Sequence, residues 1–217
     1  MAAATLTISS KNYSSWSLRG WLMARMAGVD FEEVQVDPDD ASARAEILLL
    51  SPSILVPCLT YDGAKVWDTL AIGEFLNEIA PLAGLLPADR TQRAHCRSIC
   101  GEIHSGFVSL RSALPMNLKG DFPNFKIWSK ALGDIARIQE IWRECLLAYG
   151  GPCLFGKPSM ADAMYAPVAT RFHTYHVPLD PVSQAYCEHI LALPAMKEWT
   201  EAAQLESDGF EELEVEF

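Results

Sequence analysis

The sequence predicts an α/β domain followed by an all-helical domain. Alternating runs and helical runs take turns up to about residue 85, only helical spacing follows, and 217 residues suit one large domain or two small ones. Half of the residues are hydrophobic and 21% are charged, which is typical of globular proteins. We expect a first domain at 1–82, a linker at 83–90, a helical domain at 91–206 and an acidic tail at 207–217.

The first elements form a βαβ unit. Leu6 and Ile8 alternate with polar residues and predict a strand, and Val34 and Val36 predict a second strand in the same way. Between the two strands, apolar residues recur at helical spacing. Gly28 follows the last of them and is suited to end the helix in the left-handed conformation.

The rest of the first domain reads as a helix, a hairpin and a helix. Residues 39–50 are predicted to form a helix. It ends at Ser51-Pro52, because the residue before a proline is pushed out of the helical region. Strands at 55–61 and 65–67 flank Asp62-Gly63, a pair that tolerates the positive φ angles of a tight hairpin turn. An apolar stripe from Ile72 to Ile79 predicts the next helix. The order of elements is therefore βαβαββα.

The second half contains two long apolar stripes at helical spacing. One runs from Ile99 to Leu114 and the other from Trp128 to Cys145, so we expect two long helices that pack together. Three later helix starts carry capping or proline signals: Ser159 with Asp162, Asp180-Pro181, and Pro194.

Charge and cysteine usage exclude several classes of function. The formal net charge is −11 and we find no basic patch, so no nucleic-acid partner is expected. No apolar run approaches the roughly 18 residues of a membrane span, and no targeting segment is recognised at the start, so we expect a cytoplasmic protein without membrane contact. The six cysteines form no Cys-x-x-Cys pair and are expected to be reduced and buried.

The element order resembles a known family. With Val56-Pro57 opening the third strand and Asp68-Thr69 opening the third helix, βαβαββα resembles the thioredoxin-like domain of glutathione transferases, and the helical second half agrees. The stretch LPAMKEWTEAA is similar to the last helix of many bacterial members. NYSSWSLRGWL is similar to the Ser-Ser-Cys-x-Trp-x-x-Arg signature of the zeta class, the maleylacetoacetate isomerases, in which Trp16 and Arg19 match and the other positions are shifted.

This resemblance implies a function. A family member binds glutathione as cosubstrate in the first domain, holds a small hydrophobic electrophile in the helical domain, needs no metal and usually forms a homodimer. Two alternatives stay open. One is a glutathione-dependent cis–trans isomerase of the maleylacetoacetate type, and the other is a non-catalytic module that keeps the fold for binding.

Two pairs of residues are candidates for binding glutathione. In the family, the peptide bond at Val56-Pro57 is cis and lets the ligand pair with the backbone of Val56 like another strand. The alternative is a proline on an edge strand. Asp68 and Thr69 take the place of the family's Glu or Gln followed by Ser, which holds the α-amino-acid end of the γ-glutamyl residue. The alternative is an ordinary N-cap.

The loop before the first helix is the candidate for activating the sulfur. Helix N-termini favour anions such as a thiolate, and a nearby donor lowers the thiol pKa further. The family resemblance makes Ser14 the first candidate, Asn12 the second and Ser15 the third, with Tyr13 also in the loop. A simple capping loop is the alternative.

Other polar clusters have a simpler interpretation. Cys96, Cys100 and His104 repeat every four residues and permit metal ligation, but the cysteines lie on or beside an apolar stripe, which favours buried small residues. Basic residues on the first long helix permit contact with an anionic substrate, but a solvated face is the favoured explanation. These are Arg93, Arg97 and Arg111, together with His104.

Overall fold

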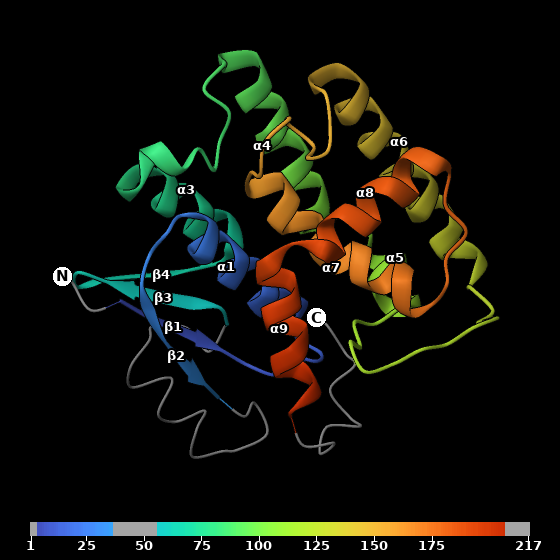
Figure 1. The fold of residues 1–217 in the computed structure, drawn as a ribbon, viewed down its shortest axis with the longest axis horizontal. Coiled ribbons are helices and arrows are strands. Elements are labelled where there is room, and N and C mark those ends of the chain that lie inside the picture. Colours follow the sequence, from blue (N-terminus) through green and yellow to red (C-terminus); the bar gives the residue numbers. More distant parts are fainter. Residues whose placement is uncertain (1–3, 37–55, 207–217) are drawn as a thin grey trace.

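The structure is a computed structural model that describes residues 4–36 and 56–206. It confirms the predicted α/β domain followed by a helical domain (Figure 1). The predicted helix at 39–50 and the acidic tail at 207–217 lie outside the described residues.

The first domain contains a mixed four-stranded sheet in the order β2-β1-β3-β4. Strand β1 pairs in parallel with β2 and antiparallel with β3, and β4 pairs antiparallel with β3. The elements are β1 (Ala4–Ile8), α1 (Ser15–Met26), β2 (Phe31–Gln35), β3 (Cys58–Tyr61), β4 (Ala64–Trp67) and α3 (Thr69–Ile79). Helices α1 and α3 pack side by side on this sheet (Figure 1).

Local signals in the sequence mark several of these boundaries correctly. Gly28 follows α1 at φ 69° and so ends it in the left-handed region. Asp62 and Gly63 have φ angles of 47° and 80°, as the predicted hairpin turn requires. Pro57 lies just before β3, where its missing N–H removes no bond from the strand ladder.

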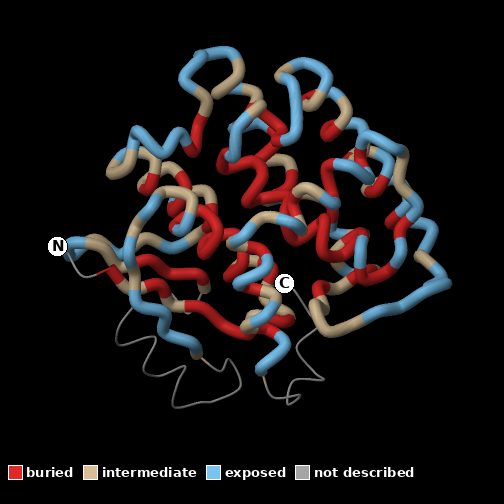
Figure 2. Tube along the Cα trace, in the orientation of Figure 1, coloured by how far each residue is buried: buried red, intermediate tan, exposed pale blue. Residues whose placement is uncertain are grey.

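The second domain consists of helices that surround α7. After the short 3-10 helix η1 (Pro81–Ala83), they are α4 (Arg90–Ser105), α5 (Val108–Ala113), α6 (Ser129–Tyr149), α7 (Met160–Thr174), α8 (Pro181–Ala192) and α9 (Pro194–Gln204). Nearly every residue of α7 is buried (Figure 2), because α1, α4 and α8 all pack against it. The core therefore runs continuously from one domain into the other.

One predicted helix is two helices. The stripe from Ile99 to Leu114 predicted a single long helix, but α4 ends at Ser105 and α5 begins at Val108. Phe107 has a φ of 57°, which no helix accommodates, and the side chain of Arg111 donates to the carbonyl of Gly106 across the break. The stripe residues are buried all the same, which is why their spacing hid the break.

The predicted contact between the two longest helices is present. Arg137 on α6 donates to both carboxylate oxygens of Glu102 on α4, at 2.8 and 3.1 Å. At the other end of α6, Tyr149 lies with its hydroxyl 2.8 Å from Nδ1 of His95. None of the described helices is long and apolar enough to span a bilayer.

Candidate functional site

The first part of the candidate site is the entrance to β3. The Val56–Pro57 peptide bond is cis, as predicted. Pro57 is buried against α1 at Gly20, where an added Cβ would lie only 2.6 Å from Cγ of the proline ring. Gly20 is therefore required for this close approach, and through it the backbone of Val56 is held beside the first turns of α1.

The second part is the N-terminus of α3, where Asp68 is the cap. Its Oδ1 accepts the N–H groups of Leu70 and Ala71 at 2.8 and 3.3 Å. The φ of Asp68 is 72°, a conformation that costs energy for a residue other than glycine and is concentrated at functional sites. Thr69 is only 1% exposed, so its side chain faces the protein rather than solvent.

A residue of the helical domain completes this part of the site. Nε2 of His104 on α4 lies 3.0 Å from Oδ2 of Asp68, and its Nδ1 lies 3.4 Å from Oγ1 of Thr69. The ring also meets Trp16 of α1 edge to face, with the centroids 5.2 Å apart. Nothing in the sequence indicated that His104 contacts Asp68, because the two residues belong to different predicted domains.

The third part is the loop that leads into α1. Ser14 is the N-cap: its Oγ accepts the N–H of Ser17 at 3.2 Å and donates to Oγ of Ser17 at 2.9 Å. Ser14 is half-buried, so its hydroxyl is within reach of a ligand at the start of the helix. Both the capping role and the position at a helix N-terminus agree with the sequence analysis.

The other two candidates of this loop are engaged inside the protein. Asn12 is 2% exposed, and its side-chain oxygen accepts the N–H of Lys119 at 3.0 Å. Ser15 is fully buried and accepts a hydrogen bond from Arg19 at 3.2 Å. Burial leaves both side chains without a face toward a ligand, so Ser14 is the strongest of the three candidates.

Two arginines lie close to the ring of Trp16. The guanidinium carbon of Arg19 lies 4.4 Å from the ring centroid of Trp16, and that of Arg111 lies 5.9 Å away. Arg19 also donates to the carbonyl of Met164 on α7 at 2.9 Å, which ties α1 to the helical domain. Cations close to the start of α1 add to the helix dipole, and both favour an anion there.

The six cysteines of the protein lie in its interior. All six are buried. Burial is the main cause that raises the pKa of Cys145, Cys153 and Cys187 to about 12, so these thiols stay protonated at neutral pH. These three thiols, all in the helical domain, are therefore poor nucleophiles at neutral pH.

The spacing of Cys96, Cys100 and His104 does not form a metal site. Both cysteines are buried in the core, whereas the ring of His104 faces Asp68. Within residues 4–36 and 56–206, no group of three or more potential ligands comes together to hold a metal ion.

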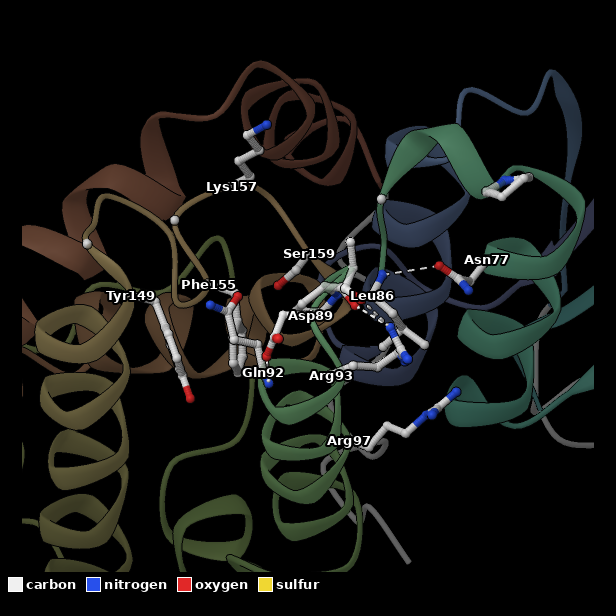
Figure 3. Close-up of a pocket in the computed structure, with 16 residues that line it drawn as sticks. Asn77, Leu86, Asp89, Gln92, Arg93, Arg97, Tyr149, Phe155, Lys157 and Ser159 are labelled. Carbon is white, nitrogen blue, oxygen red and sulfur yellow. Dashed lines mark hydrogen bonds between the residues drawn. The ribbon is translucent and has the colours of Figure 1, made fainter.

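A cavity of about 770 Å³ lies elsewhere, between the end of α3, the start of α4 and the α6–α7 connection (Figure 3). It touches Asn77, close to the C-terminus of α3, and none of the residues predicted to bind glutathione or to activate its sulfur lines it. Its arginines are engaged by the protein, since Arg97 is paired with Glu74 at 2.7 Å and Arg93 donates to the carbonyl of Ala88 at 2.7 Å. The cavity is separate from the candidate site.

The fold and the contacts define a two-domain protein with a thioredoxin-like N-terminal domain. A polar site lies where that domain meets the helical domain. Residues 13–79 match the family model described as the N-terminal domain of glutathione S-transferases, and residues 126–202 match that of the C-terminal domain. The chain therefore belongs to the glutathione S-transferase family, and it is a glutathione transferase.

Individual relatives agree with this assignment. A maleylacetoacetate isomerase from Rattus norvegicus is 29% identical over 185 residues, covering 83% of this chain and 84% of that protein. A maleylacetoacetate isomerase from Rhizobium meliloti (strain 1021) is 37% identical over 87 residues, covering 40% of this chain and 41% of that protein.

A solved structure agrees as well. A glutathione transferase homolog from Burkholderia gl BGR1, with bound glutathione, has a TM-score of 0.69 and 25% sequence identity, covering 94% of this chain and 99% of that chain. The omega 3C glutathione transferase from Trametes versicolor, at 19% identity, a TM-score of 0.69 and coverage of 90% and 88%, shares the fold.

Proposed function

We propose that the protein binds reduced glutathione where the N-terminal domain faces α4, and transfers its thiolate to a small hydrophobic electrophile held by the helical domain. The observation that carries this proposal is the Asp68 cap. Only one of its oxygens caps α3, while the other points toward the helical domain at His104. The glutathione bound to the Burkholderia homolog supports the choice of ligand.

The γ-glutamyl end, the peptide part and the thiol of glutathione each have a matching group. Oδ2 of Asp68 would hold the ammonium group of the γ-glutamyl residue, and the start of α3, at Thr69, would attract its carboxylate. The peptide part would pair with the backbone of Val56, beside Pro57, as an added strand does. The thiol would then lie at the start of α1, beside Ser14.

Ser14 would activate the sulfur by hydrogen bonding. Its hydrogen would turn from Ser17 to the thiolate, while its oxygen still accepts the N–H of Ser17. A hydrogen bond to a charged group contributes about 1.5–3 kcal/mol, which corresponds to roughly one to two pKa units of the thiol. The thiol proton leaves to solvent, the thiolate forms a bond to the electrophilic carbon, and the leaving group departs with its electron pair.

The test combines calorimetric titration with reduced glutathione and turnover of an aryl halide at neutral pH. We expect one-site binding and turnover, and a fall in kcat of about tenfold in Ser14→Ala, with binding retained. Ser98→Ala is the control, because Ser98 donates only to the carbonyl of Ala94 on the surface of α4. Full turnover in Ser14→Ala would refute the role of Ser14, and absence of glutathione binding would favour the non-catalytic module.

A second candidate reaction is favoured by the relatives named maleylacetoacetate isomerase. There the thiolate would add to a carbon of the cis double bond, rotation about the resulting single bond would follow, and loss of the thiolate would restore the double bond as trans. Isomerisation of maleylacetone by the purified protein distinguishes this reaction from conjugation, because no glutathione is consumed.

We further propose that the protein acts as a cytoplasmic homodimer, in accord with its family. The chain has a mass of 24.0 kDa, so light scattering would give twice this value for the dimer.

A further inference from the structure

Glu206, which follows the end of α9, is hydrogen-bonded to the loop that precedes α1. The carboxylate of Glu206 accepts hydrogen bonds from Oγ of Ser10 at 2.7 Å and from the N–H groups of Lys11 and Asn12 at 2.6 and 3.0 Å. Nε2 of Gln35 donates to it as well, at 2.7 Å. One side chain from the far end of the chain thus satisfies two backbone donors of a loop in the first domain.

Ser10 connects Glu206 with the start of α1. Oγ of Ser10, which donates to Glu206, also accepts the N–H groups of Asn12 and Tyr13, both at 3.2 Å. The carbonyl of Ser10 accepts the N–H of Ser14 at 3.0 Å. Ser10 therefore has Glu206 on one side and the cap of α1 on the other.

Other groups hold the same loop independently of Glu206. Nε1 of Trp199 donates to the carbonyl of Lys11 at 2.9 Å. On the opposite side, the N–H of Lys119 donates to Oδ1 of Asn12 at 3.0 Å. Because these bonds remain, replacing Glu206 is expected to loosen the loop without unfolding it.

We propose that Glu206 is a positioning residue for thiolate formation, an inference that rests on the proposed function. Its carboxylate fixes the path of residues 10–13, and this path sets where the hydroxyl of Ser14 and the first turn of α1 meet the sulfur. Electrostatic stabilisation depends on donors that are held in place before the charge develops. Glu206 itself does not touch the sulfur, and the site for the γ-glutamyl end, at Asp68, lies on a different element.

The decisive variant is Glu206→Gln, which keeps the size of the side chain and turns an amide toward backbone N–H donors. The readouts are the pKa of the bound glutathione thiol, from the ultraviolet absorbance of the thiolate, and the separate values of kcat and KM. We expect a raised thiol pKa and a kcat about three- to tenfold lower at neutral pH, with the KM for glutathione changed less than about twofold.

Two further variants make the experiment specific. Glu198→Gln is the control, because Glu198 lies on α9, shortly before Glu206 in the chain, and pairs with Arg25 on the surface at 2.6 Å. Ser10→Ala removes the hydroxyl that links Glu206 to the loop, and it is expected to change the thiol pKa in the same direction as Glu206→Gln. Thermal unfolding verifies that each variant is folded.

The outcomes separate this inference from the proposed function. An unchanged thiol pKa and kcat in folded Glu206→Gln and Ser10→Ala, with normal thiolate in the unsubstituted protein, would overturn the inference alone. A loss of stability without a change in thiol pKa would do the same, because it would mark Glu206 as a purely structural clamp. Absence of any bound thiolate in the unsubstituted protein would overturn the proposed function, and the inference with it.

Discussion

Two helix N-termini in this protein carry the same chemical groups, a carboxylate and a hydroxyl, and use them differently. At the start of α7, Asp162 is 1% exposed and forms a capping box with Ser159. Its carboxylate also accepts the N–H of Leu154 at 3.0 Å and the hydroxyl of Tyr186 at 3.1 Å. Every partner of this carboxylate belongs to the protein interior.

At the start of α3, the side chain of Asp68 is 40% exposed. One oxygen caps the helix and the other lies at the domain interface beside His104. The φ of 72° adds a conformational cost that the cap at α7 avoids, since Ser159 has ordinary extended dihedral angles. A buried carboxylate whose oxygens accept hydrogen bonds inside the protein serves folding. A carboxylate on a strained backbone, with one oxygen turned outward, is suited to binding.

The largest effect is expected from Asp162→Ala. The change leaves the N–H of Leu154, the hydroxyl of Tyr186 and both donors of Ser159 without their acceptor, and all three residues are buried. Since each of these four unsatisfied buried groups costs about 1–3 kcal/mol, we expect the free energy of unfolding to fall by roughly 4 kcal/mol or more. Urea unfolding monitored by circular dichroism measures this loss in the free energy of unfolding. A loss smaller than that caused by removing an exposed helix cap would contradict the comparison between the starts of α7 and α3.

The same carboxylate predicts a pH dependence. Burial is the main cause that raises the pKa of Asp162, and its hydrogen bonds oppose the shift only in part. The folded protein therefore binds this proton more readily than the unfolded chain does. The contribution of Asp162 to stability is greatest below its unfolded pKa of about 3.9 and declines as the pH rises through its folded pKa. The difference in free energy of unfolding between the unsubstituted protein and Asp162→Asn should then shrink as the pH rises. A difference that stays constant with pH would argue against a raised pKa of Asp162.

The next effect is on binding, from Asp68→Ala. Removing the acceptor of the ammonium group should weaken glutathione binding about tenfold or more, because a hydrogen bond to a charged group contributes about 1.5–3 kcal/mol. The loss of a cap alone destabilises a helix by only about 1 kcal/mol. Calorimetric titration and thermal unfolding of the same variant separate the two effects.

Asp89 provides the matched control. It caps α4 through the same kind of hydrogen bonds but with ordinary extended dihedral angles, accepting the N–H groups of Thr91 and Gln92 at 2.9 Å each. Asp89→Ala should therefore lower stability by a similar amount and leave glutathione affinity unchanged. Equal affinities in the two variants would remove the distinction between a binding cap and a structural cap.

The sequence predicted the local part of this structure well. Gly28, the Asp62-Gly63 turn and the proline at the start of α8 each act on the backbone within a few residues, so their effect is visible in the sequence itself. The break between α4 and α5 was missed for the opposite reason. Its residues continue the apolar spacing of a helix, and only the φ of Phe107 shows the interruption.

The site was predictable only in outline. Asp68 and Ser14 could be proposed because a carboxylate and a hydroxyl at helix starts are local signals. The contact of His104 with Asp68, and that of Glu206 with Ser10, join residues that are far apart in the chain. No periodicity or motif in one sequence encodes such a pairing, because it follows from how the two domains pack.

The smallest effect expected is that of His104→Ala. A half-exposed partner of a carboxylate contributes about 0.2–1 kcal/mol, so glutathione affinity should fall by only about two- to fivefold. His95→Ala is the control, because His95 lies on the same helix and faces Tyr149 at its other end. The double variant with Asp68→Ala gives the coupling between the two residues. If His104 acts by orienting Asp68, its removal has little effect once Asp68 is gone. Fully additive losses would instead mean that His104 contacts the ligand by itself, and that the outward oxygen of Asp68 does not depend on the helical domain for its orientation.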